Sequence, residues 1–221
     1  MKYSENLYTS LCVLFSIFIV LGNIIYQKFV HLHVPFVHTF EISVGTILYP
    51  LTFLITDLIA EFFGKHKANY CVKMALLINI MVVGIIYFMD YLPATSWSKI
   101  DDLTFHNMFG VYYIAFGSSI VACYLSQTID IKLYSTIRKL TKERFLWLRN
   151  IVSTSASLFI DTVVVIAIMS FFKIVPLDNM LSLIASSYSW KLFFTIFSSP
   201  IFCIIVFLLR KYYFHKKSYA L

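Results

Sequence analysis

The stretch that decides the fold is residues 146–172, which read LWLRNIVSTSASLFIDTVVVIAIMSFF. A run of about 20 predominantly apolar residues is long enough to cross a bilayer as an α-helix. Asn150, Thr154, Ser157 and Asp161 recur at spacings of four, three and four, so they share one face of that helix. Asp161 lies about 16 Å deeper along the helix than Asn150, near the bilayer midplane. Because an ionisable group at that depth is costly, we predict that this face lines a bundle interior or a wet cavity.

Five further apolar runs accompany this one, so the sequence predicts six membrane-spanning helices. Hydrophobic residues make up 60% of the chain and charged residues 13%, whereas soluble domains have about 45–50% and about 25%. The runs lack the period-two alternation of outer-membrane strands. We therefore predict an all-α polytopic membrane protein in which residues 1–221 form a single six-helix domain. The predicted spans are Leu7–Ile25, Ile42–Phe63, Val72–Met89, Met108–Leu133, Leu146–Phe172 and Leu181–Leu209.

Lysine and arginine gather in alternate connections between the predicted spans. Lys2 and residues 65–73, 132–149 and 210–217 hold most of the 18 basic residues. Because basic residues accumulate in cytoplasmic loops, both termini are predicted to lie in the cytoplasm. The net charge of +7 follows this distribution, so we attribute it to membrane topology and not to nucleic-acid binding.

The second predicted span carries two carboxylates on one helix face. Asp57 and Glu61 are four residues apart, and Tyr49 continues the same face. Pro50 removes one backbone hydrogen bond within the span, so we expect a broken helix there, with the carboxylates below the break. Such a break suits a polar ligand. For Glu61, the alternative is that it ends the helix at the membrane interface.

The fourth predicted span carries Gln127 and Asp130 on one face, with an interfacial role as the alternative for Asp130. Residues 126–130 read SQTID and residues 157–161 read SLFID, so successive spans share S-x-x-I-D. This echo suits a site built between adjacent spans. In the sixth span, Lys191 either pairs with an intramembrane carboxylate or extends to the membrane surface, and its long aliphatic stem favours the second.

Short signatures of several other protein classes are absent from the sequence. There is no nucleotide-binding G-x-x-x-x-G-K-[ST], no H-E-x-x-H and no G-x-S-x-G. The four cysteines form no C-x-x-C motif, and His31, His33 and His38 lack the further ligands that a metal site requires. We predict no metal, no cofactor and no enzymatic activity.

Three spaced motifs resemble those of a known family. Residues 49–64 contain Y-P-L-T-F-L, then T-D, E and G, and residues 126–130 contain S-Q-x-x-D. Residues 146–154 contain L-W-L-R-N followed by S-T, and D-T follows at 161–162. In this order they resemble the hallmarks of bacterial queuosine precursor transporters, a vitamin-uptake-transporter-like family. The resemblance covers about residues 10 to 210.

The resemblance implies a six-helix importer of the bacterial inner membrane. Its fold would be similar to the substrate-binding subunits of energy-coupling-factor vitamin transporters. Its cargo would be 7-cyano- or 7-aminomethyl-7-deazaguanine, or queuine. Its other partner would be the lipid bilayer, and the resemblance is compatible with an oligomer. The chain departs from the family at Leu158, where members commonly have glutamine, and at Ile151, where many have a second asparagine. These departures concern the details of substrate contact.

A deazaguanine has chemistry that fits the polar residues of these spans. One carboxylate can accept both N1–H and N2–H, so we hypothesise that Asp161 or Asp57 reads the guanine edge. An amide such as Gln127 or Asn150 can donate a hydrogen bond to the O6 acceptor. Arg149 is expected to neutralise the charge of Asp130 or Glu61. We assign substrate binding to Asp57, Gln127, Asn150, Asp161, Tyr49 and Ser157, and a structural or coupling role to Glu61, Asp130 and Arg149.

Three other functions stay open on sequence grounds. The first is a substrate-binding subunit that needs a separate ATPase motor, which uptake by the protein alone would exclude. The second is a membrane-embedded enzyme that uses paired aspartates as acid and base, which would alter the imported molecule. The third is an assembly protein, whose deletion would leave nucleobase uptake unchanged.

Overall fold

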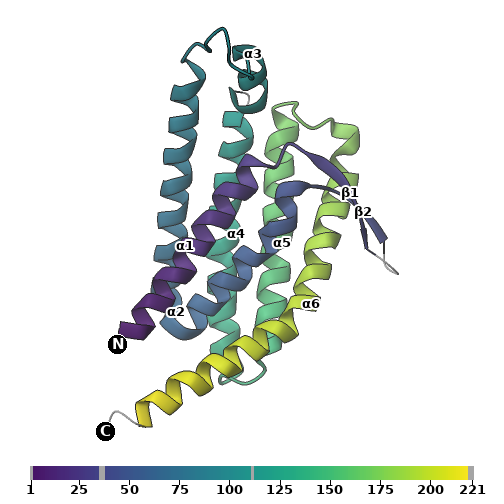
Figure 1. The fold of residues 1–221 in the computed structure, drawn as a ribbon. Coiled ribbons are helices and arrows are strands. Elements are labelled where there is room, and N and C mark those ends of the chain that lie inside the picture. The colour runs from purple at the N-terminus through teal and green to yellow at the C-terminus, as the bar shows by residue number, and fades with distance from the viewer. Residues whose placement is uncertain (1, 35–37, 111, 219–221) are drawn as a thin grey trace.

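The computed structural model describes residues 2–34, 38–110 and 112–218, and its residues are mostly helical, at 82%. Five helices in this part of the chain are long and apolar enough to cross a membrane (Figure 1). The helix α1 begins, and α6 ends, at the same end of the bundle, and α3 lies at the opposite end. In chain order the elements are α1 (Lys2–Ile24), β1 (Phe29–Val34), β2 (His38–Ser43), α2 (Val44–Asp90), α3 (Asp102–Phe105), the π-helix η1 (His106–Gly110), α4 (Tyr112–Leu140), α5 (Leu146–Phe171) and α6 (Leu177–Ser218).

The third predicted span, and the second apart from its first two residues, lie in one element, α2, which bends sharply at Gly64. This residue has φ 83° and ψ 169°, a left-handed backbone conformation that glycine adopts without the strain of a Cβ atom. Residues 44–63 and 65–90 therefore form two helical legs that run in opposite directions (Figure 1). The break expected at Pro50 is wrong, because the backbone stays helical through the proline.

A β-hairpin between α1 and α2 is the main departure from the all-α prediction. β1 and β2 pair antiparallel from Phe29–Ser43 to Val34–His38. Along β2, Phe40 and Ile42 are buried while Thr39 and Glu41 are exposed, which is the alternation of a strand with one covered face. The buried side chains pack against Trp190 of α6 and form a small apolar core there. The hairpin thus covers one side of α6.

The buried and exposed surfaces of the bundle are those of a protein in lipid. Large apolar side chains such as Leu77, Phe159 and Phe207 point outward, each about half exposed or more. Polar and charged side chains, including Asp57, Asp161 and Arg149, are buried instead. A hydrocarbon environment favours this arrangement, because polar groups then find their partners inside the bundle.

One close helix crossing shapes the interior. A Cβ atom on Gly45, at the start of α2, would overlap the backbone of Gly22 near the end of α1. The absence of side chains at this crossing brings the two backbones into contact. Both glycines line the internal cavity described below.

Candidate substrate site

The repeated S-x-x-I-D segments of α4 and α5 lie against each other in opposite directions. The Ser126 hydroxyl donates a hydrogen bond of 3.3 Å to Asp161 Oδ1. At the other end of the contact, the Ser157 side chain lies beside Asp130. Each serine therefore meets the aspartate of the other segment, which gives two Ser–Asp sites about one helical turn apart.

Asp161 is held by three helices besides its own. Tyr49 of α2 donates a 2.6 Å hydrogen bond to Oδ1, and Lys191 Nζ of α6 lies 2.9 Å from Oδ2. The same ammonium group donates to the Thr162 hydroxyl at 2.9 Å and sits 4.8 Å from the centre of the Tyr49 ring. The expectation that Lys191 extends to the membrane surface is wrong, since only 4% of the residue is exposed. With Ser126 of α4, the Asp161 site joins four helices.

An internal cavity of about 120 Å³ opens above this ion pair. Apolar cavities of about 150 Å³ bind benzene, so the space is close to the size of one aromatic ring. Asp161, Thr162 and Lys191 supply its charged and polar wall. Further lining residues are Gly22, Asn23, Tyr26, Phe29, Ser43, Gly45, Thr46, Tyr49, Ala115, Phe116, Ser119, Val165, Ile166, Met169, Val175, Leu183 and Ser187.

A second, larger cavity of about 590 Å³ adjoins the first on the side of the β-hairpin. The two share Tyr26, Phe29, Met169, Val175 and Leu183. The outer cavity adds polar side chains from the turn after α1, the hairpin, η1 and the start of α6, namely Gln27, Glu41, Asn107, Asn179, Ser182 and Ser186. The shared lining residues place the two cavities next to each other, between the hairpin end of the bundle and the Asp161–Lys191 pair.

Asn23 is a cavity residue that the sequence reasoning missed. Its Oδ1 accepts a 2.7 Å hydrogen bond from the Ser119 hydroxyl, which fixes the amide orientation. Its Nδ2 is buried and has no hydrogen-bond partner among the described residues. A donor held in place at a cavity wall is a candidate ligand contact. The available signal was an amide side chain next to Gly22 near the end of an apolar run.

The second Ser–Asp site contains two carboxyl groups. Asp57 Oδ2 accepts hydrogen bonds from Asn150 Nδ2 at 2.5 Å and from the Thr154 hydroxyl at 3.3 Å. Asp130 lies close enough to Asp57 for the two carboxyl groups to interact directly. Both residues are fully buried. Within the described part of the chain, Asp57 Oδ1, both Asp130 oxygens and the Ser157 hydroxyl have no hydrogen-bond partner.

Gln127 of α4 reaches α2, and both the oxygen and the nitrogen of its side-chain amide form hydrogen bonds there. Its Oε1 accepts from the Thr56 hydroxyl at 2.9 Å, and its Nε2 donates to the Thr52 hydroxyl at 3.3 Å. All three side chains are fully buried. This contact ties the two helices together beside the carboxyl pair.

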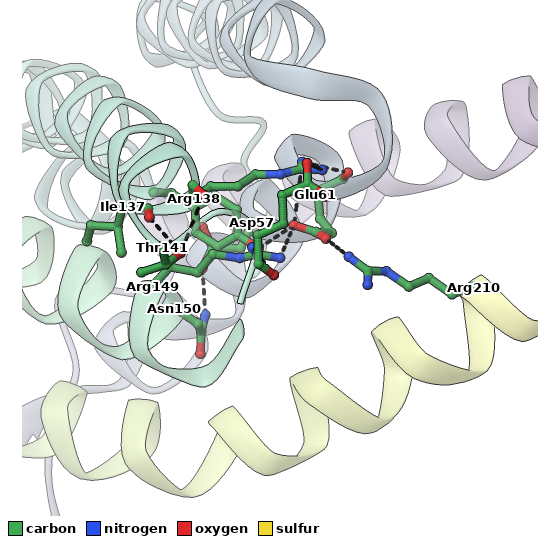
Figure 2. A network of polar contacts seen from close by, with 10 residues as sticks. Asp57, Glu61, Ile137, Arg138, Thr141, Arg149, Asn150 and Arg210 are labelled. Atoms are coloured by element: carbon green, nitrogen blue, oxygen red, sulfur yellow. Dashed lines mark hydrogen bonds and ion pairs between the residues drawn. The ribbon is translucent and has the colours of Figure 1, made fainter. Parts of the chain in front are cut away.

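A third polar cluster surrounds Glu61, where the first leg of α2 ends (Figure 2). Arg149 lies 2.6 Å from Glu61 Oε2, and the Tyr134 hydroxyl donates to the same oxygen at 2.9 Å. Arg210 pairs with the other oxygen, and Arg138 donates to the Glu61 backbone carbonyl at 3.2 Å. Of the two carboxylates considered for Arg149, the structure pairs it with Glu61. The cluster joins α2, α4, α5 and α6, and none of its residues lines the cavity.

Of the six residues predicted to bind substrate, Tyr49 and Asp161 line the cavity. Asp57, Asn150 and Ser157 belong to the carboxyl-pair site, and Gln127 forms the α2–α4 contact. Their role as substrate ligands stays a prediction. Among the described residues, no group of three or more His, Cys, Asp or Glu side chains is arranged to hold a metal ion.

Comparison with known proteins places the chain in a family. The family model described as "Putative vitamin uptake transporter" matches residues 43–205. A protein of Bacillus subtilis (strain 168), named probable queuosine precursor transporter, is 31% identical over 163 residues, which cover 72% of this chain and 69% of the relative. No solved structure matches the chain, so its likeness to the energy-coupling-factor subunits stays a prediction. The chain belongs to the vitamin uptake transporter family and is a multi-pass membrane transporter.

Proposed function

We propose that this protein imports queuosine precursors, flat 7-deazaguanine bases, across the bacterial inner membrane. The family motifs and the name of the Bacillus subtilis relative support this cargo. In the proposed topology each leg of α2 is one span, which gives six spans with both termini in the cytoplasm. A continuous α2 of 47 residues would be about 70 Å long, more than twice the hydrocarbon core of about 30 Å, so two spans fit it better than one.

The single observation that carries the proposal is the Asp161–Lys191 pair in the wall of the inner cavity. A guanine-like edge presents ring and amino N–H donors beside a carbonyl acceptor. Asp161 accepts from the donors, because a carboxylate offers about four lone-pair positions and three described groups use only part of them. The unpartnered Asn23 Nδ2 donates to the carbonyl oxygen.

Aromatic side chains supply the remaining recognition. Tyr49 and Phe29 line the cavity and offer flat apolar faces to the ring. Because the inner cavity is close to the size of one ring, the second ring and the 7-substituent extend toward the larger outer cavity. The substituent then faces the polar side chains of the hairpin end.

One end of the bundle contains cavities and the other is closed by ion pairs, as expected for the outward-open state of an importer. The cavities open toward the hairpin, which is the extracellular end in the proposed topology. The Glu61 cluster closes the cytoplasmic end by linking four helices through buried and half-buried ion pairs. Inward release would require Arg210 or Arg138, the more exposed partners, to leave Glu61.

Reconstitution of the purified protein alone into lipid vesicles tests the function. We expect uptake of labelled 7-cyano-7-deazaguanine that unlabelled queuine inhibits. Asn23→Ala should weaken binding about tenfold, which corresponds to a lost hydrogen bond of about 1.4 kcal/mol. Asp161→Asn should abolish uptake, while Glu5→Gln, an exposed carboxylate in α1, serves as the matched control.

The result also decides between the proposal and its rivals. Vesicles that bind the base but never move it would favour a motor-dependent binding subunit. A chemically altered product in the lumen would favour an enzyme. Wild-type binding and uptake in both Asn23→Ala and Asp161→Asn would contradict the site.

A further inference from the structure

We propose that Asp57 and Asp130 form a proton-binding site that couples base uptake to the proton gradient. The proposal rests on the proposed function for its transport cycle. It assigns to these two residues a role apart from substrate contact, at a place that neither cavity reaches.

The first argument is the crowding of acceptors. Asp57 and Asp130 are fully buried and interact directly, yet three of their four carboxylate oxygens have no hydrogen-bond partner among the described residues. Two carboxylates in contact in a low-dielectric interior cannot both be ionised, and the favourable arrangement is one proton shared between them. The shared proton supplies the missing hydrogen bond.

The second argument is the Ser157 side chain. It is fully buried, lies beside Asp130 and has no hydrogen-bond partner within the described residues. When the pair releases its proton, this hydroxyl group can donate to the carboxylate that it faces. Ser157 is thus available to the site from α5, next to the Asn150 and Thr154 groups that hold Asp57.

The third argument is that nearby cations are engaged elsewhere. From α5, Arg149 binds Glu61 and contacts the Tyr134 hydroxyl of α4. From α6, Lys191 binds Asp161 and Arg210 binds Glu61. In the described part of the chain, neither Asp57 nor Asp130 forms an ion pair that would neutralise it. A proton meets this need and, unlike a sodium ion with its shell of several oxygen ligands, requires no cavity.

The position of the site explains how the proton would be coupled to the base. Ser157 and Asp161 are neighbours on one face of α5, and Ser126 and Asp130 are neighbours on the facing side of α4. The carboxyl pair therefore lies about one helical turn from Asp161 in the cavity wall, on the side of the Glu61 cluster. With the proton bound, α2 and α4 are joined through Asp57 and Asp130. Its release leaves two like charges that push the helices apart and loosens the path toward the cytoplasm.

The first experiment reads the proton without any substrate. Infrared difference spectra of Asp130→Asn against the wild-type protein at neutral pH should show the loss of a protonated carboxyl C=O band. Asp178→Asn, an exposed carboxylate in α6, should not change that band. Absence of a protonated carboxyl band that depends on Asp130 would overturn the proposal, whatever the transported molecule is.

The second experiment separates coupling from transport. In vesicles with an outside pH one unit below the inside, wild-type protein should accumulate labelled 7-cyano-7-deazaguanine up to about tenfold, the limit for one proton per base. Asp130→Asn should lose this accumulation but still exchange labelled for unlabelled base at equal pH.

Each outcome of that experiment has a distinct meaning. Gradient-driven accumulation by Asp130→Asn, or accumulation driven by sodium at constant pH, would overturn the proton site. If wild-type protein neither exchanges nor accumulates the base, the proposed cargo fails, while the infrared result still decides whether the carboxyl pair holds a proton. An Asp130→Glu variant that restores the band and the accumulation would confirm the requirement for a carboxyl group.

Discussion

The two Ser–Asp sites arise from the same five-residue motif and yet differ in charge and access. At the first, Asp161 meets Ser126, an ammonium group and a phenol, and lines a cavity. At the second, Asp130 meets Ser157 and a second carboxyl group, and it lines neither cavity. The motif places an aspartate at the contact of α4 with α5, and the chemistry of each site is then set by the charged side chain that another helix brings there.

The charged side chain comes from a different helix in the two cases. α6 brings Lys191 to Asp161, so the first site is an ion pair with its charges balanced. α2 brings Asp57 to Asp130, so the second has an excess of negative charge. A balanced pair can present a fixed carboxylate to a ligand, whereas an unbalanced pair changes its state when a proton arrives or leaves.

The largest expected effect is a contrast in stability between the two aspartates. Asp161→Asn leaves the Lys191 ammonium buried without its partner, which should cost about 3–5 kcal/mol of unfolding free energy. Asp130→Asn removes a carboxyl group that pairs with no cation among the described residues, so it should cost less than about 1 kcal/mol. Denaturant unfolding in detergent, followed by circular dichroism, measures both. Equal losses would mean that the two sites do not differ in charge balance.

A double variant tests the same contrast from the other side. Lys191→Met added to Asp161→Asn removes the orphaned ammonium group and should recover about 2–4 kcal/mol of the loss. Base uptake should stay absent, since the carboxylate is still missing. Lys173→Met, an exposed lysine after α5, is the matched control and should recover nothing. Failure of the double variant to recover stability would show that the buried Lys191 ammonium group does not depend on Asp161 for its stabilisation.

The sequence could predict which residues share a helix face but not which face of another helix they meet. Asp161 and Ser157 fall on one stripe because the helical period fixes it. The partner of Asp161 depends on how α6 is rotated against α5, and no local pattern encodes that rotation. The long aliphatic stem of Lys191 favours a side chain that extends to the membrane surface, but the packing of α6 against α5 directs this side chain into the bundle.

The hairpin and the break in α2 show the same limit at the level of the fold. Residues 38–43 alternate as a strand, but they adjoin a long apolar run, and hydropathy alone predicts that the span begins at Ile42. Pro50 was the obvious helix breaker, yet a helix in a bundle can keep its path around one missing hydrogen bond. Gly64 allowed the turn, because its left-handed φ is open to glycine at little cost.

A moderate effect is expected at the second position of the motif, where the two segments differ. Gln127 bridges Thr52 and Thr56, whereas the equivalent Leu158 is fully buried. Gln127→Leu removes two interhelical hydrogen bonds and leaves two hydroxyl groups with fewer partners, at a cost of about 1–3 kcal/mol. Gln127→Glu, which keeps the shape, separates size from hydrogen bonding. An unchanged unfolding free energy in Gln127→Leu would contradict the bridge.

The smallest effect distinguishes the serines themselves. Ser126→Ala removes the hydroxyl that donates to Asp161, so it should lower the unfolding free energy by about 0.5–1.5 kcal/mol. Ser157→Ala removes a buried hydroxyl without a hydrogen-bond partner in the described structure, so the change should be near zero or slightly stabilising. The two substitutions delete the same atom from equivalent motif positions, which makes each the control for the other. A loss at Ser157 as large as the loss at Ser126 would mean that Ser157 donates a full hydrogen bond to a carboxylate, and Asp130 would then be ionised rather than part of a proton-sharing pair.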